Sequence, residues 1–324
     1  VCSPLARPRD RPVRMSDPSN HGLRVVALAG GVGGARLVDG LDRALPPGSL
    51  SAVVNTGDDF QHWGLHISPD LDTVMYTLAG LAPEDRGWGI DGDSFELLAE
   101  AKRRGVDDWF QLGDRDLLTH LVRTGALARG ESLTEATHGL CQTLDVRRTI
   151  LPMSDGPQPT SILTESGEQL AFQHWLVKER AAPPVRGVLH GGGTKATPAV
   201  LGALDAADLI VICPSNPYVS IDPILRLAGV REALQQTKTV AVSPIIGGKA
   251  VKGPLATMLP QIAGREPSAE AVARHYAGLL DGYAVQHGDG FEASYPILET
   301  NILIQAREDR LVFAGELLEL ARSL

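Results

Sequence analysis

The stretch LRVVALAGGVGGARLVDGL, residues 23–41, decides the fold class of this chain. It opens with an apolar run over residues 23–29 that has the length and β-branched character of a buried strand. Glycines then crowd together at Gly30, Gly31, Gly33 and Gly34. Residues 35–45 place apolar side chains at helical spacing. This order of strand, glycine-rich turn and helix predicts the first unit of a nucleotide-binding α/β fold.

The glycine loop predicts a phosphate ligand, and a tight turn without a ligand is the alternative. Glycines let the backbone approach a phosphate, and a helix N-terminus offers free N–H groups and partial positive charge. The NAD fingerprint is not met, because Arg36 stands where a third Gly or Ala is needed. Asn55, rather than an acidic residue, follows the second predicted strand at residues 50–54. No Gly-Lys-Ser/Thr ending marks a P-loop, so ordinary ATPase chemistry is disfavoured too.

Composition favours a cytoplasmic enzyme or small-molecule binder. The chain has 324 residues, of which 43% are hydrophobic and 21% charged, as in ordinary globular proteins. Its formal net charge of −9 argues against nucleic acid or anionic lipid as a partner. No apolar stretch reaches transmembrane length. The cysteines, Cys2, Cys141 and Cys213, are scattered and fit a reducing compartment.

We predict one α/β domain over residues 23–324, preceded by a disordered tail. Residues 1–22 are rich in arginine and proline, and Met15 is a candidate start. Helical patterns dominate residues 60–145, which predicts a helical insertion over the active edge. Within it, Ser68 is the expected N-cap of one helix and Asp114 that of another. Runs at 161–164 and 169–175 predict a hairpin.

Five polar or glycine-rich loops each follow a strand-like run. They are GGVGG, NTGDD, HGGG after residues 185–190, PSNP after 208–213 and SPIIGGK after 239–243. In a parallel sheet the carboxyl ends of the strands share one edge, where ligands bind. One such loop merely turns the chain, but five together predict a site at that edge of a Rossmann-like, mainly parallel sheet flanked by helices.

Acidic residues beside the predicted phosphate point to a divalent cation. Asp58 and Asp59 would repel a diphosphate unless Mg²⁺ lay between them, and Mg²⁺ takes one or two carboxylates plus substrate oxygens. Asp70 and Asp72 are ambiguous, because acidic residues in a helix's first turn also stabilise its dipole. Arg115 is either an exposed arginine or a clamp for substrate.

In this order, GGVGGAR, NTGDD, SPDLDTVMYTL, RGWGI, LGDRDLLTHLVR, LPMSD, PSNPYVSIDPIL and VAVSPIIGGK resemble the 2-phospho-L-lactate transferase family, which builds the deazaflavin coenzyme F420. The resemblance runs from about residue 23 to 289. It implies transfer of a phospho-acyl group from a GDP-linked donor to the ribityl hydroxyl of the deazaflavin Fo, with release of GMP. The acyl group is lactyl, enolpyruvyl or glyceryl, and a homodimer is expected.

The resemblance also implies roles for individual residues. Asp58 and Asp72 would hold the metal, and Asp72 and Arg115 would contact Fo. The nucleotide would lie along a set of loop residues: Gly30, Gly31, Gly33, Gly34, Asn55, Ser215, Asn216 and Pro217. The loop HGGGTKATP is more glycine-rich than the family pattern.

Two alternatives stay open. One is a nucleotide-sugar-binding regulator similar to the gluconeogenesis-factor family, which shares the glycine-rich opening. That family continues its acidic pair with a Gly/Ser-rich loop, whereas Phe60, Gln61, His62 and Trp63 follow Asp58 and Asp59 here. The other is an unrelated nucleotide-sugar transferase.

Overall fold

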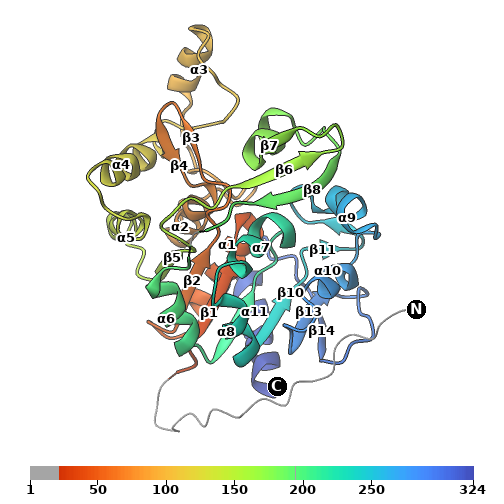
Figure 1. The fold of residues 1–324 in the computed structure, drawn as a ribbon. Helices are drawn as coiled ribbons and strands as arrows, with labels where there is room; N and C mark the ends of the chain where they lie inside the picture. The colour runs from red at the N-terminus through yellow and green to blue at the C-terminus, as the bar shows by residue number, and fades with distance from the viewer. Residues whose placement is uncertain (1–21, 194) are drawn as a thin grey trace.

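A seven-stranded parallel sheet forms the centre of the computed structural model, which describes residues 22–193 and 195–324 (Figure 1). Its strand order is β14-β13-β10-β9-β1-β2-β5, and every neighbouring pair is parallel. The strands are β1 (Val25–Ala29), β2 (Leu50–Val54), β5 (Thr149–Pro152), β9 (Leu209–Ile212), β10 (Lys238–Val242), β13 (Gly282–Gln286) and β14 (Ile297–Thr300). The predicted Rossmann-like α/β class is confirmed.

The apolar runs are explained by burial of both faces of the sheet. All five residues of β1 are buried, as expected for a central parallel strand. Val25 and Ala27 belong to one apolar cluster, whereas Val26 and Leu28 belong to the cluster on the opposite face. The sheet is therefore the middle layer of a three-layer structure.

Helices cover both faces. One cluster includes side chains of α1 (Gly31–Ala44), α2 (Pro69–Leu78), α5 (Leu133–Thr143) and α11 (Arg307–Ser323). The other includes α6 (Pro198–Ala206), α7 (Asp222–Leu225), α8 (Val230–Gln236), α9 (Leu255–Ala263) and α10 (Ala269–His275). Gly40 lets α1 approach α11, since a Cβ there would lie 2.3 Å from the Arg310 carbonyl oxygen.

A smaller antiparallel sheet, β7-β6-β8, stands beside the main one. The predicted hairpin is confirmed, with β6 (Thr160–Thr164) antiparallel to β7 (Gln169–Ala171). A single π-helical turn, η1 (His174–Lys178), occupies the end of the predicted second strand. The placement of residues 185–190 in the parallel sheet is wrong, because β8 (Val185–His190) pairs antiparallel with β6. Only Val185 of β8 is fully buried, so this strand covers a surface and does not fill the core.

Residues 60–145 contain helices and an unpredicted hairpin. The hairpin joins β3 (Phe60–His62) to β4 (Leu65–Ile67) through Trp63 and Gly64, both with positive φ. After α2 come α3 (Glu96–Arg103) and α4 (Asp116–Ala128), which stand above the carboxyl edge of the sheet with the hairpin (Figure 1).

Of the two predicted caps in this segment, the position of Ser68 is confirmed and Asp114 is wrong. Ser68 is the N-cap residue of α2, but its hydroxyl donates to Asp59 (2.7 Å) and makes no side-chain cap hydrogen bond to the helix. Asp114 accepts the N–H groups of Glu96 and Leu97 (both 3.0 Å) and so caps α3, while Asp93 accepts the N–H of Asp116 (3.0 Å) at the start of α4. The aspartate that precedes each helix therefore caps the other helix. Closeness in sequence alone does not reveal this arrangement.

The predicted tail at residues 1–22, with Met15, lies outside the described residues except for Gly22. Among the described helices, none combines the length and the apolar character needed to cross a membrane.

Candidate active site

The glycine loop and the PSNP loop pack directly against each other at the carboxyl edge. A Cβ at Gly33 would lie 2.5 Å from the Pro214 carbonyl oxygen, and one at Gly34 would lie 2.7 Å from the Ser215 hydroxyl. The Ser215 hydroxyl accepts the Gly30 N–H (3.1 Å) and donates to the Gly30 carbonyl (2.8 Å). These glycines are therefore required for close packing whether or not a phosphate binds.

Asp70 supplies an anion at the N-terminus of α1. The Gly31 N–H, on a residue with φ of +63°, donates to Asp70 Oδ1 at 2.7 Å. A Cβ at Gly30 would lie 2.6 Å from Asp70 Oδ2. The first turn of α1 has no acidic residue of its own, so Asp70 of α2 provides the negative charge that a helix N-terminus favours.

Asn55 joins this carboxylate to the NTGDD loop. Its side-chain amide donates to Asp58 Oδ1 (2.5 Å) and to Asp70 Oδ2 (2.9 Å), and its carbonyl oxygen accepts the Gly57 N–H (2.8 Å). Asn55 is fully buried at the end of β2. The two carboxylates that the structure brings together are thus Asp58 and Asp70.

Both carboxylates sit in a site unfavourable to negative charge. Burial raises the pKa of Asp58 well above its ordinary value, and the charges of Asp70 and Asp59 raise it further, while a hydrogen bond from Gln173 (2.9 Å) opposes the shift. Burial also raises the pKa of Asp70 to about 6, against hydrogen bonds from Asn55 and Gly31. A cation between these groups would relieve their repulsion.

Asp72 lies on the other side of α2. Two positions along a helix turn a side chain through about 200°, so Asp70 and Asp72 face different surroundings. Asp72 accepts two hydrogen bonds from the guanidinium of Arg123, one of them at 3.1 Å, and Arg123 is fully buried. His120 Nδ1 lies 3.6 Å from Asp72 Oδ2. The structure therefore pairs Asp72 with Arg123 and not with Asp58.

Asp59 and Arg115 also lie apart from the Asp58–Asp70 pair. Asp59 Oδ2 contacts His66 Nε2 (3.0 Å) and accepts the Ser68 hydroxyl, so it holds the β3–β4 hairpin. Arg115 is exposed just before α4, and its guanidinium donates to the Asp91 carbonyl (3.1 Å). Within the described ranges, no hydrogen bond links Arg115 to either carboxylate of the pair.

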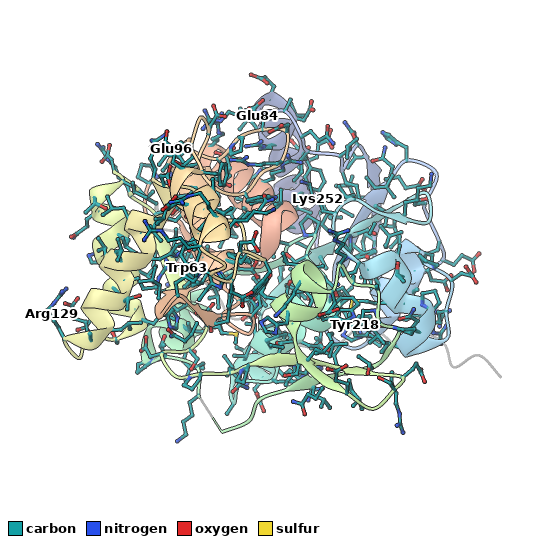
Figure 2. All side chains as sticks on the ribbon, turned by 90° about the horizontal axis from the view of Figure 1, so that it is seen from above. Trp63, Glu84, Glu96, Arg129, Tyr218 and Lys252 are labelled. Carbon is teal, nitrogen blue, oxygen red and sulfur yellow. The ribbon has the colours of Figure 1, made fainter. Side chains whose placement is uncertain are left out.

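The remaining predicted residues lie at the same edge. Asn216 accepts the Tyr218 N–H (3.0 Å), and Pro217 begins the short π-helical segment η2 (Pro217–Ile221). Seen from above, Trp63 in the turn between β3 and β4, Tyr218 in η2 and Lys252 just before α9 come from separate segments of the chain (Figure 2). Four of the five predicted loops follow parallel strands, but HGGG follows β8 of the small sheet, so its placement at the parallel edge is wrong.

Gln173 and Ser220 were missed by the sequence analysis. Gln173 reaches Asp58 from the segment between β7 and η1, far along the chain. A Cβ at Gly30 would lie 2.7 Å from the Ser220 Cβ, so Ser220 closes the glycine loop from η2. Neither residue forms part of a recognisable sequence motif spacing. For Ser220 the available signal was its position in the stretch PSNPYVS, close to the predicted PSNP loop.

The fold and these loops define a Rossmann-like α/β protein with its polar groups gathered at one end of a parallel sheet. The 2-phospho-L-lactate transferase CofD family model matches residues 25–295, and the chain belongs to that family. It is a transferase of the phospho-acyl type used in coenzyme F420 biosynthesis.

Two relatives named phosphoenolpyruvate transferase support this membership. The protein from Streptomyces griseus is 44% identical, over 82% of this chain and 86% of its own length. The protein from Thermobifida fusca is 41% identical, over 93% of this chain and 99% of its own. A solved UPF0052-family structure from Bacillus halodurans, 20% identical with a TM-score of 0.56, covers 92% of this chain and 91% of its own and shares the fold.

Proposed function

We propose that the protein transfers a phospho-acyl group from a GDP-linked donor to the ribityl hydroxyl of Fo, with release of GMP. The observation that carries this proposal is the assembly of the glycine loop, the PSNP loop and the Asp58–Asp70 pair at one edge of the sheet. Phosphoryl transfer depends on positioning and electrostatics, which such an edge can supply.

The donor phosphates would lie along the N-terminus of α1. The Gly31 N–H is already used by Asp70, so the N–H groups that follow it in the first turn would face the phosphates. The guanosine part would extend over Asn216 and Pro217. Release of GMP requires stabilisation of charge on its phosphate, for which oriented N–H groups are suited.

Mg²⁺ fits Asp58 with Asp70 better than Asp58 with Asp72. The first two carboxylates share one amide donor and have raised pKa values, whereas the charge of Asp72 is compensated by Arg123. Two carboxylates plus substrate oxygens make a suitable set for this ion. Bound there, Mg²⁺ would act as a Lewis acid on phosphate oxygens.

We propose enolpyruvyl as the transferred acyl group, because the Streptomyces and Thermobifida relatives are both named phosphoenolpyruvate transferase. A competition of lactyl, enolpyruvyl and glyceryl donors for the same protein tests this choice. Preferential consumption of the enolpyruvyl donor is expected, and equal consumption of all three would contradict it.

The central test is a direct assay. Protein incubated with Fo, a GDP-linked donor and Mg²⁺ should release GMP and form a negatively charged derivative of Fo in equal amounts. Omission of Fo should prevent GMP release, and chelation of Mg²⁺ should lower it. Nucleotide binding without turnover would instead favour a regulatory protein.

We further propose that the protein is a homodimer in the cytoplasm. Light scattering during gel filtration tests the homodimer.

Arg115 is proposed to contact the acceptor. Arg115→Ala should raise the KM for Fo or lower kcat and leave GDP binding unchanged, because the side chain is exposed and far along the chain from the glycine loop. Steady-state kinetics in Fo, with GDP titrated separately, measure both effects. Arg129→Ala is a matched control on an exposed arginine at the other end of α4. Weaker GDP binding with unchanged Fo kinetics would reverse the assignment.

A further inference from the structure

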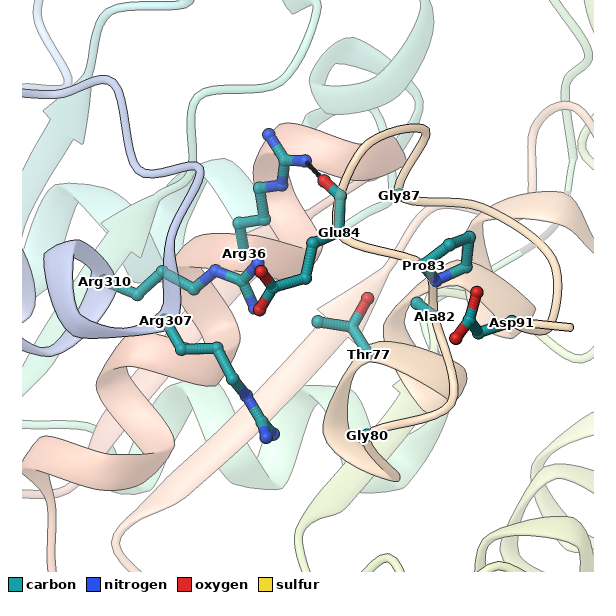
Figure 3. A pocket seen from close by; sticks show the side chains of 10 residues that line it. All are labelled: Arg36, Thr77, Gly80, Ala82, Pro83, Glu84, Gly87, Asp91, Arg307 and Arg310. Atoms are coloured by element: carbon teal, nitrogen blue, oxygen red, sulfur yellow. Dashed lines mark hydrogen bonds between the residues drawn. The ribbon is translucent and has the colours of Figure 1, made fainter.

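A separate pocket lies between α1, the C-terminal end of α2 and the first turn of α11 (Figure 3). Its volume is about 200 Å³, and it shares no lining residue with the Asp58–Asp70 pair. Three guanidinium groups line it, from Arg36, Arg307 and Arg310. A pocket with this composition is suited to an anion, because guanidinium donors match phosphate and carboxylate oxygens.

Arg36 is the least compensated of the three. It is only 5% exposed, and its side chain donates to the Glu84 backbone carbonyl (2.5 Å). Across residues 22–193 and 195–324, no carboxylate forms an ion pair with it. Burial lowers the pKa of Arg36 and the charge of Arg310 lowers it further, while the charge of Glu84 opposes the shift. A guanidinium carries five N–H donors, so most of its hydrogen-bonding capacity is unused here.

The two arginines of α11 that line the pocket share one carboxylate. Asp39 accepts hydrogen bonds from Arg310 (3.0 Å) and Arg43 (3.1 Å), and Arg307 lies 3.8 Å from it. The Arg310 Nε is buried and has no hydrogen-bond partner among the residues that the structure describes. One carboxylate thus serves three guanidinium groups near the positive end of α11, whose first turn also carries the exposed acidic residues Glu308 and Asp309.

Two carboxylates also line the pocket, Asp91 and Glu84. Figure 3 shows the arginines on one side, Asp91 on the other and Glu84 between them. Glu84 is exposed, and no hydrogen bond or ion pair fixes its carboxylate within the described part of the chain. Glu84 can therefore make way for a ligand at small cost.

We propose that this pocket binds a phosphate group, either inorganic phosphate or the phosphate of a small monoester. Arg36 and Arg307 would hold its oxygens, and the first turn of α11 would add N–H groups. The pocket volume suits a phosphate with few further atoms. Its wall also reaches the glycine loop, since a Cβ at Gly87 would lie 2.4 Å from Val32 Cγ1.

Thermal unfolding of the whole chain tests the proposal, with inorganic phosphate titrated against chloride at constant ionic strength. At a phosphate concentration about ten times the Kd, the melting temperature should rise by about 2–4 °C. Arg307→Gln should weaken phosphate binding by about tenfold or more. Glu84→Gln should strengthen it, because the competing carboxylate is gone. Arg322→Gln, at the exposed far end of α11, is the matched control and should bind as the wild type does.

Parallel titrations with glycerol phosphate and with GDP distinguish the sources. Stabilisation by inorganic phosphate that persists in saturating GDP supports a pocket separate from the nucleotide site. Two results would place the anion elsewhere and overturn the proposal. One is loss of phosphate binding in the presence of GDP, and the other is equal phosphate affinity of the wild type, Arg307→Gln and Glu84→Gln. Absence of phosphate-specific stabilisation in the wild type would overturn it as well.

Discussion

Asp58→Asn should lower kcat by about 10²–10³-fold, the size expected when one preorganised electrostatic group is lost from an active site. The substitution keeps the shape of the side chain and removes a charge from the Asp58–Asp70 pair. Gln173 can turn its amide to accept from the new Asn side chain, so the local packing survives. The loss should therefore fall on turnover and on the Mg²⁺ requirement.

Stability should not fall in the same variant. Because the pKa of Asp58 is raised in the folded protein, its contribution to stability is lost as pH rises from the unfolded value towards the folded one. The ionised form of Asp58 therefore opposes folding, and Asn, which cannot ionise, removes that opposition. The melting temperature at pH 7 should be unchanged or higher.

Kinetics with Mg²⁺ titration, alongside melting curves, measure both effects. Asp145→Asn is a suitable control, because Asp145 is 82% exposed and pairs with the exposed Arg147 on the surface. Wild-type turnover in Asp58→Asn would remove Asp58 from the proposed site. A large fall in melting temperature would show that its carboxylate is structural.

Asp72→Asn should lower the free energy of unfolding by about 3–5 kcal/mol, because it leaves the fully buried Arg123 without its carboxylate partner. A carboxylate that acted only on the dipole of α2 would contribute roughly 0.3–1 kcal/mol. Denaturant unfolding of the variant separates these magnitudes. The larger value also agrees with a role for Asp72 in joining α2 to α4.

The double variant Asp72→Leu with Arg123→Met is the matched control. Apolar replacement of both partners of a buried ion pair is often neutral or stabilising, so this protein should recover most of the lost stability. Its activity then reports on the Asp72–Arg123 pair without the loss of stability. If the double variant is stable but inactive, this pair has a role in the reaction beyond stability; a small loss of stability in Asp72→Asn would show that the ion pair contributes little.

The first βα unit was predictable because its determinants are local. An apolar run that is buried on both faces must be a strand of a covered sheet, and the β1, β2, β9 and β10 runs all follow this rule. Once these strands are parallel, NTGDD and PSNP necessarily meet the glycine loop at one edge. This meeting of the loops can be predicted from chain direction alone, and the hydrogen bond between Gly30 and Ser215 agrees with the prediction.

The failures have a common physical origin. The sequence of residues 185–190 correctly predicts a strand, but strand propensity does not specify which strand it pairs with. In the structure β8 pairs with β6 of the small antiparallel sheet. Asp93 and Asp114 are both near helix starts, and only the approach of α3 to α4 determines that each caps the other's helix.

The sequence by itself determined the Rossmann-like class and the edge of the sheet at which the polar loops gather, because these depend on periodicity and chain direction. Its ordered motifs indicated the family by resemblance. Only the tertiary structure decided which carboxylates meet. The rotation of α2 about its axis is set by packing on its neighbours, and it turns Asp70 towards Gly31 and Asp72 towards Arg123. Residues two positions apart on a helix cannot both face one site, and sequence spacing does not say which of them does.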